Sequence, residues 1–238
     1  MTQNEVFQYS TMSALMAGIA SHGAAISSVL EHGDHGLGTF RNLDGEMIVL
    51  DGAVYQMKSD GSVVAIESPA DVITPFATVT RFKATANAKT AVGSKEDLLD
   101  LLSRLFPSAR NHFVAIRIDG VFKSVNVRTA GGQQSPRESA TGVANRQKVN
   151  TFRSVRGTVF GFRAPDYFMG INVAGIHIHF ISDDRKEGGH ILALESEGEV
   201  DVAAAQLSKF HLELPTGDDD FNEAELAPDA KGIAAVEG

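Results

Sequence analysis

Three histidines in the last third of the chain have the types and spacing of a metal site. His177 and His179 are separated by one residue, and His190 follows after ten more. Side chains alternate between the two faces of a strand, so His177 and His179 should lie on one face, about 7 Å apart along it. The polar, glycine-containing segment that follows can turn the chain back. An antiparallel return would place His190 beside the first two.

Three neutral imidazoles are a typical ligand set for zinc and related divalent ions. Three protein ligands leave coordination positions open for water and substrate, as in catalytic sites, where the ion acts as a Lewis acid. The chain has no cysteine, so histidine and carboxylate are the strong metal ligands that it offers. Spacing alone leaves open that these histidines are polar residues on a solvated strand face.

The segments that position these residues have the patterns of strands. Residues 175–181 and 188–194 are strand-like and carry the histidines. Asp51-Gly52 and Asp119-Gly120 are each flanked by two apolar, β-branched segments, and we predict a hairpin at both because Asp-Gly tolerates the positive φ of tight turns. Arg128 then lies at the far end of a strand.

Helices and loops are also predicted. Ser94 precedes a leucine-rich face that ends before Pro107, which predicts a helix, and Ser10 could cap a short helix beginning near Met12. Residues 131–148 have the composition of a loop or a domain connection, and the acidic, turn-rich tail from Thr216 has that of a disordered segment.

Strands dominate this pattern, with a few helices, so we predict a mixed α/β fold. We expect two β-rich parts: a mixed-sheet N-terminal domain over residues 1–150 and a smaller β-rich metal-binding domain over residues 151–238. The tail would return to the active site. A cleft between the two parts is where a small-molecule site commonly forms.

The composition bears on partners and location. The formal net charge of −9 disfavours binding to nucleic acid, and no apolar run approaches the roughly 18 residues that would predict a membrane span. The first residues lack the basic and apolar regions of a secretory signal, so a cytoplasmic location is the default expectation.

Several motifs together resemble one known family. The segment GIHIHFISDDRKEGGH, residues 175–190, is similar to the metal-binding segment of the alpha-acetolactate decarboxylases. Further similar segments are YSTMSAL at 9–15, HGDHGLGTF at 32–40, LDGE at 43–46, YQMKSDG at 55–61 and TPFA at 74–77. The resemblance therefore covers nearly the whole chain.

This resemblance implies a carboxy-lyase that converts 2-acetolactate to acetoin and carbon dioxide through a metal-stabilised enediolate. It implies Zn2+ held by His177, His179 and His190, although imidazole also accepts cobalt, nickel, manganese or iron. It further implies a homodimer.

The resemblance also implies three catalytic residues. Glu46 matches a glutamate in the family's Leu-Asp-Gly-Glu turn, Arg128 matches its active-site arginine, and Glu237 matches a glutamate near the C-terminus that reaches back toward the metal. Arg128 would orient the anionic substrate through its fixed donor fork. Either Glu46 or Glu237 would donate the proton that replaces the lost carboxylate.

Two alternatives remain open from the sequence. A cupin-like metalloenzyme acting on a small keto or hydroxy acid would use an acid, here Asp183 or Asp184, as a ligand and would leave the two glutamates and Arg128 without a role. A non-catalytic metal- or ligand-binding protein would close the site with protein ligands alone. An amidohydrolase barrel fits this length and strand pattern poorly.

Overall fold

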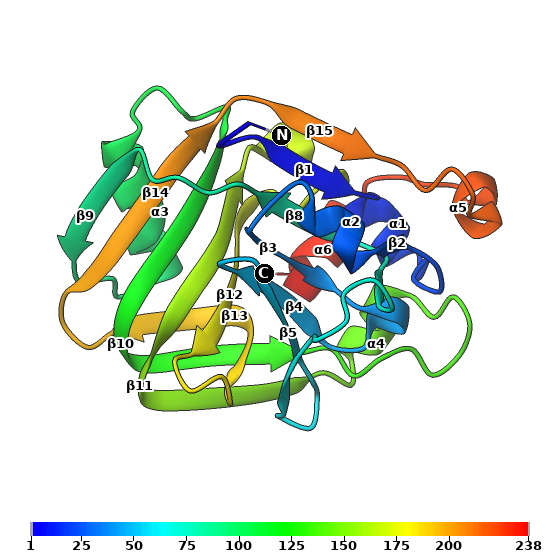
Figure 1. Ribbon diagram of the computed structural model, residues 1–238, viewed down its shortest axis with the longest axis horizontal. Helices are drawn as coiled ribbons and strands as arrows, with labels where there is room; N and C mark the ends of the chain where they lie inside the picture. The colour runs from blue at the N-terminus through cyan, green and yellow to red at the C-terminus, as the bar shows by residue number, and fades with distance from the viewer. Residues whose placement is uncertain (1, 238) are drawn as a thin grey trace.

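Two β-sheets form the framework of the computed structural model, which describes residues 2–237 (Figure 1). The first sheet has seven strands in the order β15-β1-β8-β3-β4-β5-β6. Their bounds are β1 Val6–Tyr9, β3 His35–Thr39, β4 Glu46–Leu50, β5 Ala53–Met57, β6 Val63–Ala65, β8 Ala77–Thr80 and β15 Phe210–Glu213.

The second sheet has six strands in the order β11-β12-β13-β10-β14-β9. Its strands are β9 Ala86–Thr90, β10 Phe113–Thr129, β11 Lys148–Ala164, β12 Gly175–Ser182, β13 Gly188–Ser196 and β14 Val200–Leu207. Because β10 also pairs with β11, strands β10 to β13 close on themselves. A two-stranded pairing of β2 Ala24–Ala25 with β7 Ile73–Thr74 completes the strands. The mixed α/β prediction is confirmed.

Short helices cover the sheets. They are α1 Met12–Met16, α2 Ile26–Leu30, α3 Lys95–Leu105, α4 Ala140–Ala144, α5 Asp219–Glu223 and α6 Ala230–Glu237, with 3-10 turns η1 Arg41–Leu43 and η2 Asp166–Phe168. The helix predicted after Ser94 is confirmed as α3, and the Ser94 side chain accepts a hydrogen bond from the Asp97 N–H. The cap of α1 is Thr11, not Ser10, because Ser10 takes a positive φ of 63° outside the helix.

The two predicted Asp-Gly hairpins have different outcomes. Asp51 and Gly52 form the turn between β4 and β5, with φ of 52° and 80°. The hairpin predicted at Asp119-Gly120 is wrong, because both residues lie within β10, which pairs with β11 along its length. At Gly120 the strand passes so close to β14 that a Cβ atom would lie 2.4 Å from Val200 Cγ1. This glycine therefore serves close packing rather than a turn.

The boundary predicted near residue 150 falls inside β11. Strands from both sides of residue 150 contribute to each sheet: β9 and β10 belong to the second sheet, and β15 joins the first beside β1. The division into two domains stays a prediction.

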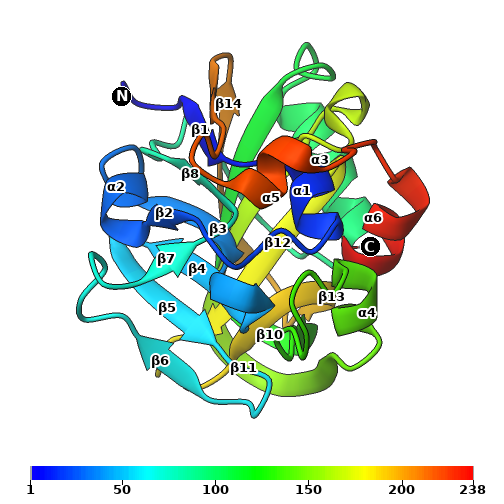
Figure 2. The same ribbon diagram turned by 90° about the vertical axis from the view of Figure 1, so that its right-hand side faces the viewer.

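The acidic tail is folded, which corrects the expectation of disorder. Residues 219–223 form α5, and α6 lies against α1 and α4, as Figure 2 shows on the side that faces the viewer. Ile233 and Val236 of α6 are buried in one apolar cluster with Leu15 of α1 and Val143 of α4. This non-local packing orders the tail despite its composition.

The core of the molecule positions β4 against β12 and β13. A cluster that includes Ile48 of β4, Phe160 of β11 and Ile181 of β12 fills the space between the sheets. A second cluster lies between α3 and the face of the second sheet that carries Ile178. No helix among residues 2–237 is long and apolar enough to cross a membrane.

Candidate metal and active site

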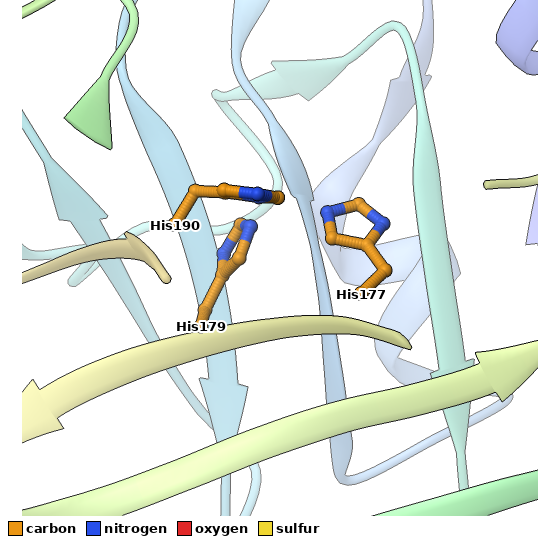
Figure 3. Close-up of side chains that lie close together, drawn as sticks. All are labelled: His177, His179 and His190. Carbon is orange, nitrogen blue, oxygen red and sulfur yellow. The ribbon is translucent and has the colours of Figure 1, made fainter. Parts of the chain in front are cut away.

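The pairing of β12 with β13 brings the three histidines together. The two strands are antiparallel, with His179 opposite His190, and His177 lies two residues before His179 on the same strand face. The potential ligand atoms lie within 4.8 Å of one another, and all three residues are buried. Figure 3 shows the three rings grouped around a common space. The antiparallel return expected from the sequence is thus present.

Backbone carbonyl groups determine which nitrogen faces that space. His179 Nδ1 lies 2.8 Å from the Met47 carbonyl oxygen, and His190 Nε2 lies 3.0 Å from the Glu237 carbonyl oxygen. A carbonyl only accepts, so these ring nitrogens carry the protons. His179 Nε2 and His190 Nδ1 then present lone pairs, and both are buried without a hydrogen-bond partner among residues 2–237. Such outer contacts commonly orient metal-binding histidines.

The surroundings keep the three imidazoles neutral. Burial, together with the nearby Arg128 and Lys95 charges, lowers the pKa of His177 to about 3. Burial likewise lowers the pKa of His179 and of His190 well below the usual value. Neutral imidazole is the form that binds a metal, and buried nitrogens without partners are costly unless a ligand satisfies them. The histidines therefore fit a shared divalent cation.

Two carboxylates and one arginine lie beside the histidines. Arg128 Nη2 lies 2.8 Å from Glu237 Oε2, and Arg128 Nη1 lies 3.5 Å from Glu46 Oε1. Glu237 Oε2 is 3.4 Å from His177 Nε2 and 3.4 Å from His190 Nδ1, whereas Glu46 Oε2 is 3.7 Å from His179 Nε2. All six residues named from the sequence thus lie in one buried cluster.

The protonation of Glu46 is shifted by this environment. The pKa of Glu46 shows a net rise to about 7, caused by burial and by the neighbouring Glu237. The Arg128 charge and a hydrogen bond from the Ala130 N–H oppose it. A carboxyl group of this kind is able to carry a proton near neutral pH.

A cavity of about 40 Å³ opens beside the cluster. Glu46, Arg128, His177 and Glu237 line one part of it. Its apolar lining side chains are Met12, Leu15, Leu43, Phe76, Ala130, Ala140, Val143, Ala144 and Val236. A buried cavity with a few convergent polar groups is the usual form of a small-molecule site.

Comparison with known proteins agrees with this arrangement. The sequence model of the alpha-acetolactate decarboxylase family matches residues 6–228. The chain belongs to the alpha-acetolactate decarboxylase family. The matched range of this family includes Glu46, Arg128 and the three histidines, whereas Glu237 lies beyond it.

Individual members of the family match over nearly their whole length. The alpha-acetolactate decarboxylase of Raoultella terrigena is 41% identical over 236 residues, which span 98% of this chain and 89% of the relative. The crystal structure of the Bacillus subtilis strain 168 alpha-acetolactate decarboxylase superposes with a TM-score of 0.91 at 36% identity, over 98% of this chain and 99% of that one.

A third match is the crystal structure of a Staphylococcus aureus protein described as similar to alpha-acetolactate decarboxylase. It superposes with a TM-score of 0.93 at 32% identity, over 98% of this chain and 100% of that one. The fold of the present chain thus agrees with both crystal structures over almost its entire length.

The acids that a cupin-like site would need lie elsewhere. Asp184 is exposed and accepts a hydrogen bond from the Ser182 hydroxyl. His35, from the family-like segment 32–40, begins β3 and is buried against Asp34 and Arg117. Neither Asp184 nor His35 lines the cavity beside the three histidines.

Sequence reasoning missed the carbonyl of Met47 and the cavity wall formed by α4. A carbonyl acceptor has no sequence signature, because nearly every residue offers one. Helix α4 lies within residues 131–148, where the composition predicts a loop, because the surrounding glycines, serines and glutamines obscure a helix of only five residues. Its apolar residues Ala140, Val143 and Ala144, at helical spacing, are the available signal for packing.

Proposed function

We propose that this chain catalyses the decarboxylation of 2-acetolactate to acetoin and carbon dioxide, with zinc bound by His177, His179 and His190. Membership of the alpha-acetolactate decarboxylase family supports the reaction. The observation that carries the site assignment is the convergence of buried ring nitrogens, two of which have no hydrogen-bond partner in the part of the chain that the structure describes. When bound, the ion would act as a Lewis acid that stabilises negative charge on oxygen.

Arg128 is proposed to bind the substrate carboxylate. It lines the cavity, and its Nε makes no hydrogen bond to any described residue although it is buried. A guanidinium keeps its charge at neutral pH and offers donors in a fixed geometry. The contacts of its other nitrogens with Glu46 and Glu237 fix its orientation.

Glu46 is proposed as the proton donor. Breaking the bond between the carboxylate carbon and C2 releases carbon dioxide and leaves an electron pair that delocalises into the keto group. A proton must then be added at C2. Glu237 Oε2 lies near two of the three histidines, which supports a place for Glu237 beside the ion. Glu46 lines the same cavity and contacts only His179 among them, which supports its role as the acid.

The test of this function is acetoin formation from racemic 2-acetolactate. The purified protein is assayed as isolated, after chelation, and after zinc is restored. We expect acetoin to appear, to disappear with the metal and to return with it. Zinc bound at one equivalent without acetoin would contradict the reaction and favour a binding protein.

The assignment of the ligands has its own test. His179→Ala is expected to lose zinc and acetoin formation together, because two imidazoles hold the ion far less tightly than three. His22→Ala, at an exposed position, is the matched control. Full zinc content in His179→Ala would contradict the assignment.

We further propose a homodimer and a cytoplasmic location. The family resemblance supports the first and the composition supports the second. A solution mass of twice 25.4 kDa in light scattering would agree with the dimer.

A further inference from the structure

The cavity beside the histidines has a polar end and an apolar end. Glu46, Arg128, His177 and Glu237 form the polar end. Helices α1, α4 and α6 contribute most of the apolar end, and α4 contributes the small side chains of Ala140 and Ala144 to it. The amount of room at the apolar end therefore depends on α4.

One face of α4 is directed at the cavity. Ala140, Val143 and Ala144 follow the i, i+3, i+4 spacing of a single helix face, and all three line the cavity. Ala140 is 5% exposed and Val143 is 2% exposed, whereas Thr141 is exposed to solvent. A larger side chain at position 140 would thus extend into the cavity rather than into solvent.

Several polar contacts hold α4 in place. The Ser139 hydroxyl accepts a hydrogen bond from the Gly142 N–H at the start of the helix. Arg146, just after the helix, donates to both carboxylate oxygens of Glu138 at 2.6 and 2.8 Å. The Gln133 amide donates to the carbonyls of Gly18 and Glu138. Because of these contacts, moving α4 away from the cavity to admit a larger ligand would require breaking hydrogen bonds.

The chemistry of an acetohydroxy acid matches the two ends. Its carboxylate, hydroxyl and keto groups lie on adjacent carbons and need the charged and metal-binding end of the cavity. Its alkyl substituents remain, and burying them against apolar side chains is favourable. They accordingly belong at the end that α4 lines.

We propose that Ala140 and Val143 of α4 receive the alkyl substituents of the substrate and set the largest substituent that the enzyme accepts. This inference rests on the proposed decarboxylation of acetohydroxy acids. Alanine at position 140 leaves room that any longer side chain would fill in a cavity of about 40 Å³. One methylene group in an apolar pocket changes kcat/KM by roughly 10- to 200-fold.

The test compares 2-acetolactate with the homologue in which an ethyl group replaces the C2 methyl. Initial rates are measured with zinc-loaded full-length protein and with Ala140→Leu, Val143→Ala and Thr141→Leu. Thr141→Leu adds the same leucine to the exposed side of α4 and is the control. Zinc content and thermal unfolding are recorded for each variant, so that loss of the fold is recognised.

We expect Ala140→Leu to lower kcat/KM for the ethyl homologue at least tenfold more than for 2-acetolactate. Val143→Ala should shift the ratio toward the ethyl homologue, and Thr141→Leu should leave it unchanged. If Ala140→Leu does not fold, the Val143→Ala ratio decides. An unchanged ratio in both cavity variants would overturn the proposal. Failure of the unmodified protein to convert either substrate would instead overturn the proposed function, and this inference with it.

Discussion

Arg128 contacts both carboxylates of the site, and each carboxylate faces a different part of the histidine cluster. Glu237 lies near His177 and His190, whereas Glu46 lies near His179. Both glutamates are buried, so neither is an ordinary solvated surface residue. Two chemically identical side chains thus occupy different positions relative to the histidines, which supports different roles for them in the site.

Replacing each glutamate by glutamine separates these roles. Glu46→Gln should keep one equivalent of zinc but lose at least 100-fold in kcat, because the amide cannot supply the proton. Metal analysis and acetoin assays on the same sample measure both quantities. Glu67→Gln, at an exposed position, is the control. Unchanged turnover in Glu46→Gln would remove Glu46 from its role as the acid.

At the scale of elements, the sequence predicts those features that depend on residues close together along the chain. The histidine pair on β12 follows from strand alternation, and the turn at Asp51-Gly52 from the backbone freedom of that dipeptide. The same dipeptide at 119–120 remains extended, because pairing with β11 along the whole strand outweighs a local turn preference. Similarly, α6 is an ordered helix because it is buried against α1 and α4, and no local sequence pattern specifies this packing.

Gly120 provides a test of the continuous strand. Gly120→Ala should destabilise the protein by about 1–3 kcal/mol, since the new methyl group would collide with Val200. Urea unfolding measures the change. Gly217→Ala is the control, because among residues 2–237 no atom beyond its chain neighbours lies within 4 Å of the added Cβ. Equal stability of the two variants would contradict the close approach of β10 to β14.

The C-terminal helix provides a second test at this scale. Ile233→Ala should weaken the packing of α6 by about 2–5 kcal/mol, because Ile233 is fully buried. Since the carbonyl and carboxylate of Glu237 contact the histidines, zinc affinity should fall by roughly 10- to 100-fold. Hydrogen exchange in residues 230–237 and zinc titration measure the two effects. Lys231→Ala, on the exposed side, should change neither.

At the scale of the whole molecule, the buried histidines make the metal-free protein sensitive to acid. Their pKa values in the folded state lie below the unfolded value near 6.5, so the unfolded state takes up protons first. The contribution of the neutral histidines to the free energy of unfolding is therefore fully present above about pH 6.5. It is lost as the pH falls toward about 3, the pKa of His177. The raised pKa of Glu46 acts in the opposite direction between pH 7 and 4.5, but one carboxyl opposes three imidazoles.

Urea unfolding of the chelated protein at pH 7.5 and 5.5 measures this dependence. Below pH 6.5, each histidine contributes a slope on the order of 1.4 kcal/mol per pH unit. His177→Gln should reduce the total slope, and His22→Gln, which is exposed, should leave it unchanged. A free energy of unfolding that does not fall between these pH values would contradict the neutral, buried state of the three imidazoles.

The contacts that fix the site join segments that are distant along the chain. The bond from His179 to the Met47 carbonyl spans 132 residues, and the contact between Arg128 and Glu46 spans 82. Contacts of such separation form slowly, because the entropy of closing long loops is lost before they form. In kinetic terms, we expect the metal centre to form late in folding. The rate at which a refolding chain acquires tight zinc binding would therefore report the docking of the two sheets rather than the formation of the β12–β13 hairpin.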